Sequence, residues 1–169
     1  MIIVAIDETD FKKASNILDN LDSDKCMIKI GSVSFNSIGH EIIFHAARKG
    51  FEIFLDLKLH DIPNTCVSTI KAVKDLKLNY LTIHISSGIQ ALKAAKKVSG
   101  KTKLVGVTIL TSLDNNALKE IGFNKDVKKL VLNQAKLAKK ANLDALVCSA
   151  QEVPFVRHVF KKEIITPGI

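Results

Sequence analysis

Seven short apolar runs alternate with longer segments of helical periodicity, and few folds accommodate such an alternation. The runs are nearly continuous in apolar residues, which is typical of parallel strands in a sheet covered by helices. We expect strands at residues 2–6, 27–30, 52–57, 80–85, 103–109, 145–149 and 163–166.

The segments between these runs predict helices. The βα unit repeats about every 25 to 40 residues, so βαβ crossovers should dominate. No linker or shift in composition divides the chain, and we therefore expect residues 1–169 to form a single α/β domain. The predicted helices are 11–21, 36–50, 64–77, 89–98, 126–141 and 151–161.

Periodicity leaves two architectures open, a doubly wound open sheet and a (β/α)8 barrel. A dinucleotide-binding open sheet calls for a glycine-rich turn after its first strand, and the turn DETDFKK at 7–13 has no glycine. Reactive side chains instead follow several different strands, and they converge on one point only if the sheet closes. These side chains are Asp7, Lys29, Asp56, Lys58, His84 and Thr111.

Composition argues against several functions. The net charge is +8, but the lysines are spread along helix faces and the chain has no Trp and one Tyr, so we expect no nucleic-acid partner. No apolar run is long enough to cross a bilayer, and the start MIIVAIDETD is a poor signal peptide, so we expect no membrane partner. Cys26, Cys66 and Cys148 fit no metal-ligand spacing and indicate reduced core thiols in a cytoplasmic protein.

The stretch FLDLKLHDIPNT at 54–65 carries an acid, a base, an imidazole and a second acid on the end of an otherwise apolar strand. Residues two apart on a strand share a face. Asp56 and Lys58 should therefore lie side by side, and Leu57 should face the other way.

Lys29 ends the second strand and should point to the same place, which predicts a row of Lys29, Asp56, Lys58 and Asp61. Alternating charges can satisfy one another, so an ion-pair cluster closing the top of a barrel is one interpretation. The functional interpretation is that Lys58, held charged beside carboxylates, gives a proton to a developing carbanion. The same charges could bind phosphate or sugar, so the spacing alone leaves the reaction open.

The same stretch resembles the signature of the orotidine 5'-monophosphate decarboxylase family, an Asp-x-Lys-x-x-Asp core followed by Ile-Pro-Asn-Thr. The resemblance covers the whole chain, because further segments are similar to family segments in the same order. These are VAID at 4–7, IKIG at 28–31, TIHISSG at 82–88, VTILTS at 107–112, LDALVCSAQE at 143–152 and ITPGI at 165–169.

The resemblance implies a (β/α)8 TIM barrel that works as a homodimer, with active sites at the dimer interface. The implied reaction converts orotidine 5'-monophosphate to uridine 5'-monophosphate and carbon dioxide in de novo pyrimidine biosynthesis. The implied enzyme is a carboxy-lyase that uses no cofactor and no metal.

The resemblance also implies roles for individual residues. Asp7 and Lys29 would bind the ribose, and Lys29 would also brace Asp56, which would lie against the substrate carboxylate. Lys58 would protonate C6 of the pyrimidine after carbon dioxide leaves. Thr111 would contact the pyrimidine.

The signature would also reach across the dimer. Asp61 would enter the partner subunit's site and complete the charged row, and Thr65 would act near the partner's nucleotide. The rest of the signature would line the substrate, namely Leu57, Leu59, His60, Ile62, Pro63 and Asn64.

The sequence ends at ITPGI, whereas family members normally continue with an arginine, a helix, an eighth strand with a Gly-Arg pair and a final helix. A glutamine that touches phosphate belongs to the same region. We therefore expect a barrel truncated after its seventh strand, without the segment that usually binds phosphate. A fragment of a longer enzyme and a natural seven-stranded barrel without catalysis both fit this pattern.

Two other functions stay open. Magnesium-dependent sugar-phosphate lyases such as hexulose-phosphate synthase are similar in the Asp-x-Lys-x-x-Asp core on the same barrel. Their pattern lacks the Ile-Pro-Asn-Thr continuation found at 62–65. Outside the enzymes, the alternative is a non-catalytic truncated barrel that dimerises or binds nucleotide.

Overall fold

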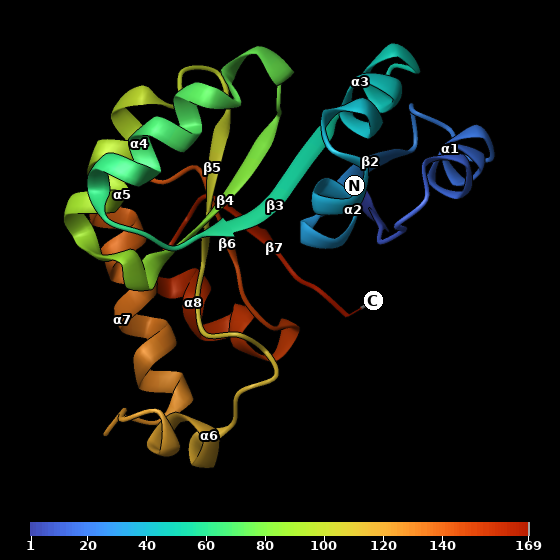
Figure 1. Cartoon of the computed structure of the whole chain (residues 1–169). Helices are drawn as coiled ribbons and strands as arrows, with labels where there is room; N and C mark the ends of the chain where they lie inside the picture. The colour runs from blue at the N-terminus through green and yellow to red at the C-terminus, as the bar shows by residue number, and fades with distance from the viewer. Residues whose placement is uncertain (169) are drawn as a thin grey trace.

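Seven parallel strands, hydrogen-bonded in sequence order, form one curled sheet in the computed structural model of the chain (Figure 1). The structure describes residues 1–168. Within those residues the pairings join each strand to the next and leave the first and the last as the two edges of the sheet. The strands are β1 (Ile2–Ile6), β2 (Cys26–Gly31), β3 (Ile53–Leu59), β4 (Tyr80–His84), β5 (Lys103–Val107), β6 (Ala145–Val147) and β7 (Glu163–Ile165).

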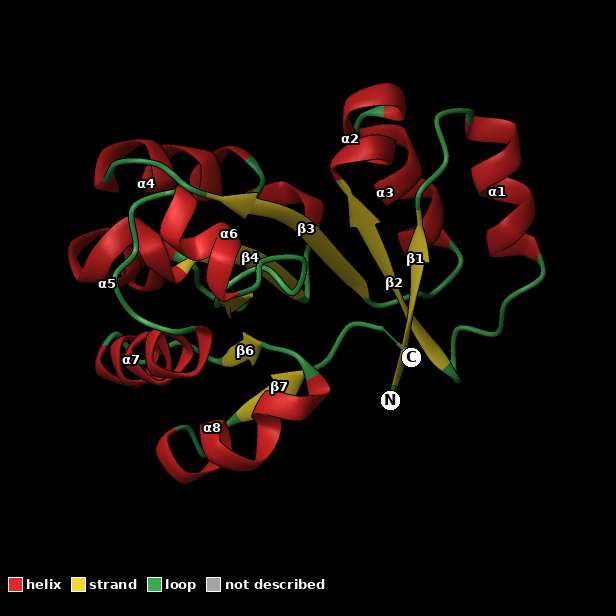
Figure 2. Ribbon diagram, turned by 90° about the horizontal axis from the view of Figure 1, so that it is seen from below, coloured by secondary structure: helices red, strands yellow, loops and turns green. Residues whose placement is uncertain are grey.

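The helices lie outside the curve of the sheet, so the strands are covered on their convex face (Figure 2). The α-helices are α1 (Phe11–Asp19), α2 (Ser32–Ile38), α3 (His40–Arg48), α4 (Pro63–Ala72), α5 (Gly88–Val98), α6 (Asn115–Glu120), α7 (Val127–Lys140) and α8 (Val153–Val159). Three short 3-10 helices are η1 (Lys74–Leu76), η2 (Ile85–Ser87) and η3 (Ala150–Glu152).

All seven predicted strands are confirmed, and the helices are confirmed with four differences. The predicted helix 151–161 begins as η3 and becomes an α-helix, α8, at Val153. The predicted helix 36–50 is instead two helices, α2 and α3, because Gly39 between them has φ 77°, which a right-handed helix does not accommodate. The predicted helix 64–77 ends as an α-helix at Ala72 and continues as η1. Helix α6 was not predicted, because it is six residues long and buries Leu118 alone.

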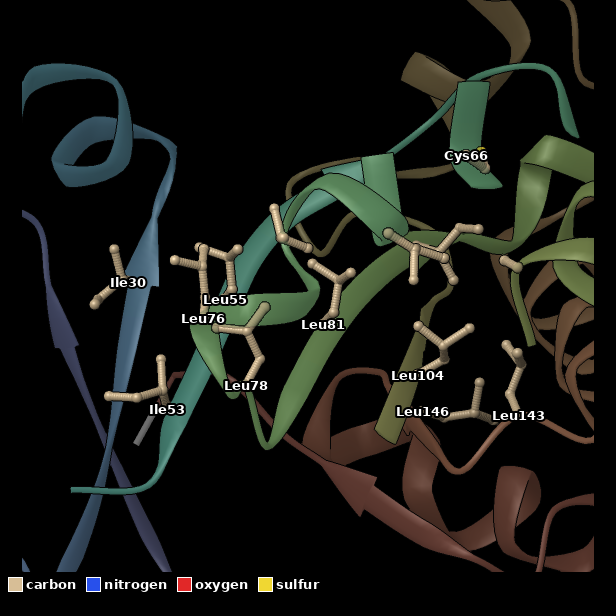
Figure 3. Close-up of a cluster of buried hydrophobic side chains, with 14 of the residues drawn as sticks. Ile30, Ile53, Leu55, Cys66, Leu76, Leu78, Leu81, Leu104, Leu143 and Leu146 are labelled. Carbon is tan, nitrogen blue, oxygen red and sulfur yellow. The ribbon is translucent and has the colours of Figure 1, made fainter. Parts of the chain in front are cut away.

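Each strand buries one set of side chains under the helices and the alternate set inside the curve. The set under the helices belongs to the large core, part of which Figure 3 shows. On the strands this set includes Ile28, Ile30, Ile53, Leu55, Leu81, Ile83, Leu104 and Leu146. The set inside the curve is a smaller cluster of Met27, Phe54, Tyr80, Val105 and Ala145.

Beyond this small cluster, the inner face of the sheet continues to the carboxyl end of the strands. Successive residues point to opposite faces, so the residue two positions further along each strand returns to the inside. The inner positions reached in this way are Lys29, Asp56, Thr82, Val107 and Val147. The fold therefore brings two charged side chains and a hydroxyl together at one end of an apolar interior.

Candidate active site

Asp56 is the centre of the charged cluster. It lies near the carboxyl end of β3 and is 7% exposed. Its Oδ2 accepts a hydrogen bond from Lys58 Nζ at 2.8 Å and lies 3.5 Å from Lys29 Nζ. Its Oδ1 accepts a hydrogen bond from Thr82 Oγ1 at 2.9 Å. A buried carboxylate is tolerated when cations and hydrogen-bond donors surround it in this way, and the same contacts hold both ammonium groups beside it.

Lys58 reaches Asp56 from an unusual backbone conformation. Its φ is 50°, in the left-handed region that side chains other than glycine rarely adopt. The register between β3 and β4 shifts at the same place, because Leu55 pairs with Leu81 and the next pair is Leu59 with Ile83. The strand is thus bulged, and a strained residue of this kind, at a cost of about 1–3 kcal/mol, is typical of functional sites.

The bulge modifies the prediction from strand periodicity without reversing it. Asp56 and Lys58 do lie side by side, but Lys58 gets there through an irregular backbone that a period of two does not predict. Leu57 faces the other way as expected and packs against the helix-side core, and Leu59 packs there as well.

Lys29 and Asp7 both lie close to Gly31. Gly31 pairs with Asp56 in the register between β2 and β3. A Cβ placed on Gly31 would lie 3.2 Å from Asp7 Oδ1 and 3.4 Å from Lys29 Nζ. Both predicted ribose-binding side chains therefore lie against the same bare stretch of backbone, next to Asp56.

A serine that the sequence did not single out anchors the residues around Asp7. Ser34 on α2 is fully buried. Its Oγ lies 2.7 Å from the carbonyl oxygens of both Ile6 and Glu8, and it accepts a hydrogen bond from Glu8 N at 3.0 Å. These contacts fix the peptide groups on either side of Asp7. Nothing in the local pattern signals them, because the partners are 26 and 28 residues apart in the sequence.

A cavity of about 320 Å³ opens beside the cluster. Lys29, Asp56 and Lys58 line it together with Thr111, Thr166 and Pro167, and most of the remaining lining is apolar. A small apolar chamber with charges at one side suits a flat ring that carries a polar substituent. A larger cavity of about 770 Å³ lies at the amino-terminal end of the strands and includes none of the predicted site residues.

Two histidines adjoin the cluster. The rings of His60 and His84 lie 5.2 Å apart, and His60 Nε2 is 3.3 Å from Ser86 Oγ. Burial lowers the pKa of His84, and the nearby His60 and Lys58 lower it further, while Asp56 opposes them. His84 at the end of β4 is therefore favoured in its neutral form.

The residues of the signature that follow β3 form no ion pair with the charged cluster of Lys29, Asp56 and Lys58 in the part of one chain that the structure describes. Asp61 is exposed, its Oδ1 accepts a hydrogen bond from Ile62 N at 2.7 Å, and no ion pair within residues 1–168 includes it. Pro63 begins α4, and Asn64 and Thr65 in its first turn are exposed. One chain thus brings together Lys29, Asp56 and Lys58 and leaves Asp61 facing solvent.

The cysteines are free thiols, as predicted, and two of them are buried. Burial raises the pKa of Cys148, which lies at the edge of the cavity, to about 11, so this thiol stays protonated. No three or more His, Cys, Asp or Glu side chains among residues 1–168 are grouped so that they could hold a metal ion. No helix in the same part of the chain is long and apolar enough to span a membrane.

The chain is similar to known proteins along its whole length. The family model described as "Orotidine 5'-phosphate decarboxylase / HUMPS family" matches residues 1–169. The orotidine 5'-phosphate decarboxylase of Buchnera aphidicola is 42% identical over 175 residues, which cover 99% of this chain and 74% of that protein. The protein of the same name from the Wolbachia of Brugia malayi is 43% identical over 172 residues, covering 99% and 76%.

Solved structures share the fold. A crystal structure of orotidine 5'-phosphate decarboxylase from Lactobacillus acidophilus is 32% identical, with a TM-score of 0.89 over 98% of this chain and 78% of that one. An uncharacterised conserved protein from Geobacillus kaustophilus is 28% identical, with a TM-score of 0.90 over 99% and 84%. The curled sheet is therefore of the predicted barrel type, and the matches agree with the resemblance read from residues 54–65.

Proposed function

The chain belongs to the orotidine 5'-phosphate decarboxylase / HUMPS family, and we propose that it converts orotidine 5'-monophosphate to uridine 5'-monophosphate and carbon dioxide. This is a carboxy-lyase reaction of pyrimidine biosynthesis. The observation that carries the proposal is the position of Asp56 between the ammonium groups of Lys58 and Lys29 at the wall of the cavity.

Lys58 is the proton donor in the proposed mechanism. The bond between C6 and the carboxylate breaks, its electron pair stays on C6, and carbon dioxide leaves. The Lys58 ammonium stabilises this charge and then gives a proton to C6, and the resulting neutral amine regains a proton from solvent. Interaction with a charge that exists only in the transition state lowers the barrier more than equal binding of substrate and transition state does.

The other residues of the cluster bind and orient. Asp56 faces the substrate carboxylate and holds both lysines in place. Lys29 and Asp7, which both lie close to Gly31, bind the ribose. Thr111 at the cavity wall contacts the pyrimidine.

We also propose that the active form is a cytoplasmic homodimer in which Asp61 and Thr65 serve the partner's site. Two features of the single chain support this proposal. Asp61 is exposed and outside the charged row, although it belongs to the signature. The neighbouring Ile62 is 65% exposed in the single chain. Such exposure of a large apolar side chain is expected where a partner subunit covers it in the dimer.

A magnesium-dependent sugar-phosphate lyase is the second candidate. The family's description also names HUMPS, which refers to the hexulose-phosphate synthase group. The Ile-Pro-Asn-Thr continuation at 62–65 and the names of the relatives favour the decarboxylase.

An assay of the purified chain with orotidine 5'-monophosphate tests the proposal. Loss of substrate absorbance is followed while uridine 5'-monophosphate and carbon dioxide are quantified, with and without EDTA. We expect equal amounts of both products and no effect of EDTA. No turnover of orotidine 5'-monophosphate, together with magnesium-dependent condensation of formaldehyde and a pentulose phosphate to a hexulose phosphate in a parallel assay, would favour the second candidate instead.

A further inference from the structure

We propose that Thr82 is a positioning residue that locks Lys58 and Asp56 in one fixed arrangement before substrate binds. This inference rests on the proposed function, since it concerns how the proton donor of that reaction is held. Thr82 lies in the middle of β4, and no part of it is exposed.

The hydroxyl of Thr82 bridges the two residues. Its Oγ1 accepts a hydrogen bond from Lys58 N at 2.7 Å and donates one to Asp56 Oδ1 at 2.9 Å. The direction of each bond is fixed, because a backbone N–H can only donate and an ionised carboxylate can only accept. A hydroxyl is the group that can do both at once with a single oxygen.

The bridge stands where the regular strand pairing fails. The register between β3 and β4 shifts around Lys58, whose φ is 50°. A buried or half-buried N–H that loses its strand partner requires another acceptor. Thr82 Oγ1 supplies that acceptor from β4, whose pairing with β5 on its other side is regular. The strained conformation of Lys58 is thus supported by a rigid element.

Lys58 is consequently held at both ends by one carboxylate. Its backbone is tied through Thr82 to Asp56 Oδ1, and its ammonium is tied directly to Asp56 Oδ2. These contacts form a closed ring of hydrogen bonds that restricts both side chains. Such support matters most for a proton donor, because a displacement of about 1 Å at a reacting group can lower the rate on the order of 10²-fold.

The test compares Thr82→Val with Thr82→Ser. Valine keeps the shape of threonine and removes the hydroxyl, whereas serine keeps the hydroxyl and removes the methyl group. Thr102→Val is the matched control. Thr102 directly precedes β5, and its Oγ1 donates a hydrogen bond to Leu78 O rather than to a residue of the charged cluster. If Thr82→Val does not fold, Thr82→Cys replaces it, since a thiol is a weak hydrogen-bonding group of similar size.

The kinetic expectation separates positioning from general packing. We expect Thr82→Val to lower kcat about 10- to 100-fold while KM changes much less, and Thr82→Ser to stay within about threefold of the parent chain. Thr102→Val should leave kcat unchanged. Equal kcat values for Thr82→Val and the parent chain, or an equal loss in Thr82→Ser and Thr82→Val, would overturn the proposal.

A second readout does not depend on the reaction. Hydrogen exchange of the Lys58 amide, followed by NMR, should be slow in the parent chain and in Thr82→Ser and faster in Thr82→Val. Exchange that is unchanged in Thr82→Val would reject the bridge. If the parent chain does not turn over orotidine 5'-monophosphate, the proposed function fails, and Thr82 is then judged by this exchange alone.

Discussion

At the scale of single residues, the site depends on charges that hold one another in place. The Lys58 ammonium lies 2.8 Å from Asp56 Oδ2, and Lys29 approaches the same oxygen at 3.5 Å. Because the carboxylate is buried, removal of either cation would leave it less well compensated. The cluster is therefore a unit, and substitutions within it should not act additively.

His84 gives this cluster a pH-dependent stability. Burial lowers its pKa, with help from His60 and Lys58 and opposition from Asp56. As the pH falls through about 6.5, the unfolded chain takes up a proton that the folded chain resists, so folding should weaken towards acid pH. Above this pH range His84 is neutral in both the folded and the unfolded chain, so it no longer lowers the free energy of unfolding.

Denaturant unfolding at several pH values between about 7.5 and 5.5 measures this effect. We expect the parent chain to lose more stability towards acid pH than His84→Gln does. His158→Gln, on the exposed side of α8, is the control and should follow the parent chain. A steeper acid loss in His84→Gln than in the parent chain would contradict the assignment.

Among the helices and strands, the repeating strand pattern could be predicted from the sequence. The local bulge at Lys58 and the contact between Thr82 and Lys58, which are distant in sequence, could not. The seven strands were predictable because each is an apolar run in a sheet with helical cover. Lys58 was not expected in a bulge, because no glycine marks its positive φ. Thr82 did carry a signal, a polar residue inside an apolar strand, but its contact with Lys58 spans 24 residues of sequence.

The boundary between α2 and α3 gives a test at this scale. Gly39 has φ 77°, and nothing lies within 4 Å of a Cβ placed there. Gly39→Ala should therefore destabilise the chain by about 1–3 kcal/mol through backbone strain alone, without contact with a neighbouring residue. Denaturant unfolding measures the loss, and Gly39→Asn should lose about as much, because ψ at this residue is −151° and that combination of angles is open essentially to glycine alone. A stabilised Gly39→Ala would mean that the two helices merge into the single helix first predicted.

At the scale of the whole molecule, one chain supplies three of the four charges in the predicted row. Lys29, Asp56 and Lys58 come together, while Asp61 is exposed on the segment between β3 and α4. The sequence could not say from which subunit each charge comes, because a strand pattern describes a single chain. The proposed dimer would supply the fourth charge.

A mixture of two inactive variants tests this sharing. In a dimer of Lys58→Ala and Asp61→Ala chains, one site carries both changes and the other site carries neither. Unfolding and refolding an equal mixture should therefore restore about one quarter of the parent activity, since about half of the dimers are mixed. Each variant refolded alone is the control. A mixture no more active than these controls would argue that Asp61 acts within its own chain.

Turnover of orotidine 5'-monophosphate by Lys58→Ala tests whether Lys58 is the proton donor. Lys93→Ala, on the exposed face of α5, is the matched control, and the fold of both variants is checked by thermal unfolding. We expect Lys58→Ala to lose about 10²- to 10⁴-fold or more in kcat, because the proton donor is gone, while Lys93→Ala turns over like the parent chain. A folded Lys58→Ala chain with undiminished kcat would contradict the assignment of Lys58 as the proton donor.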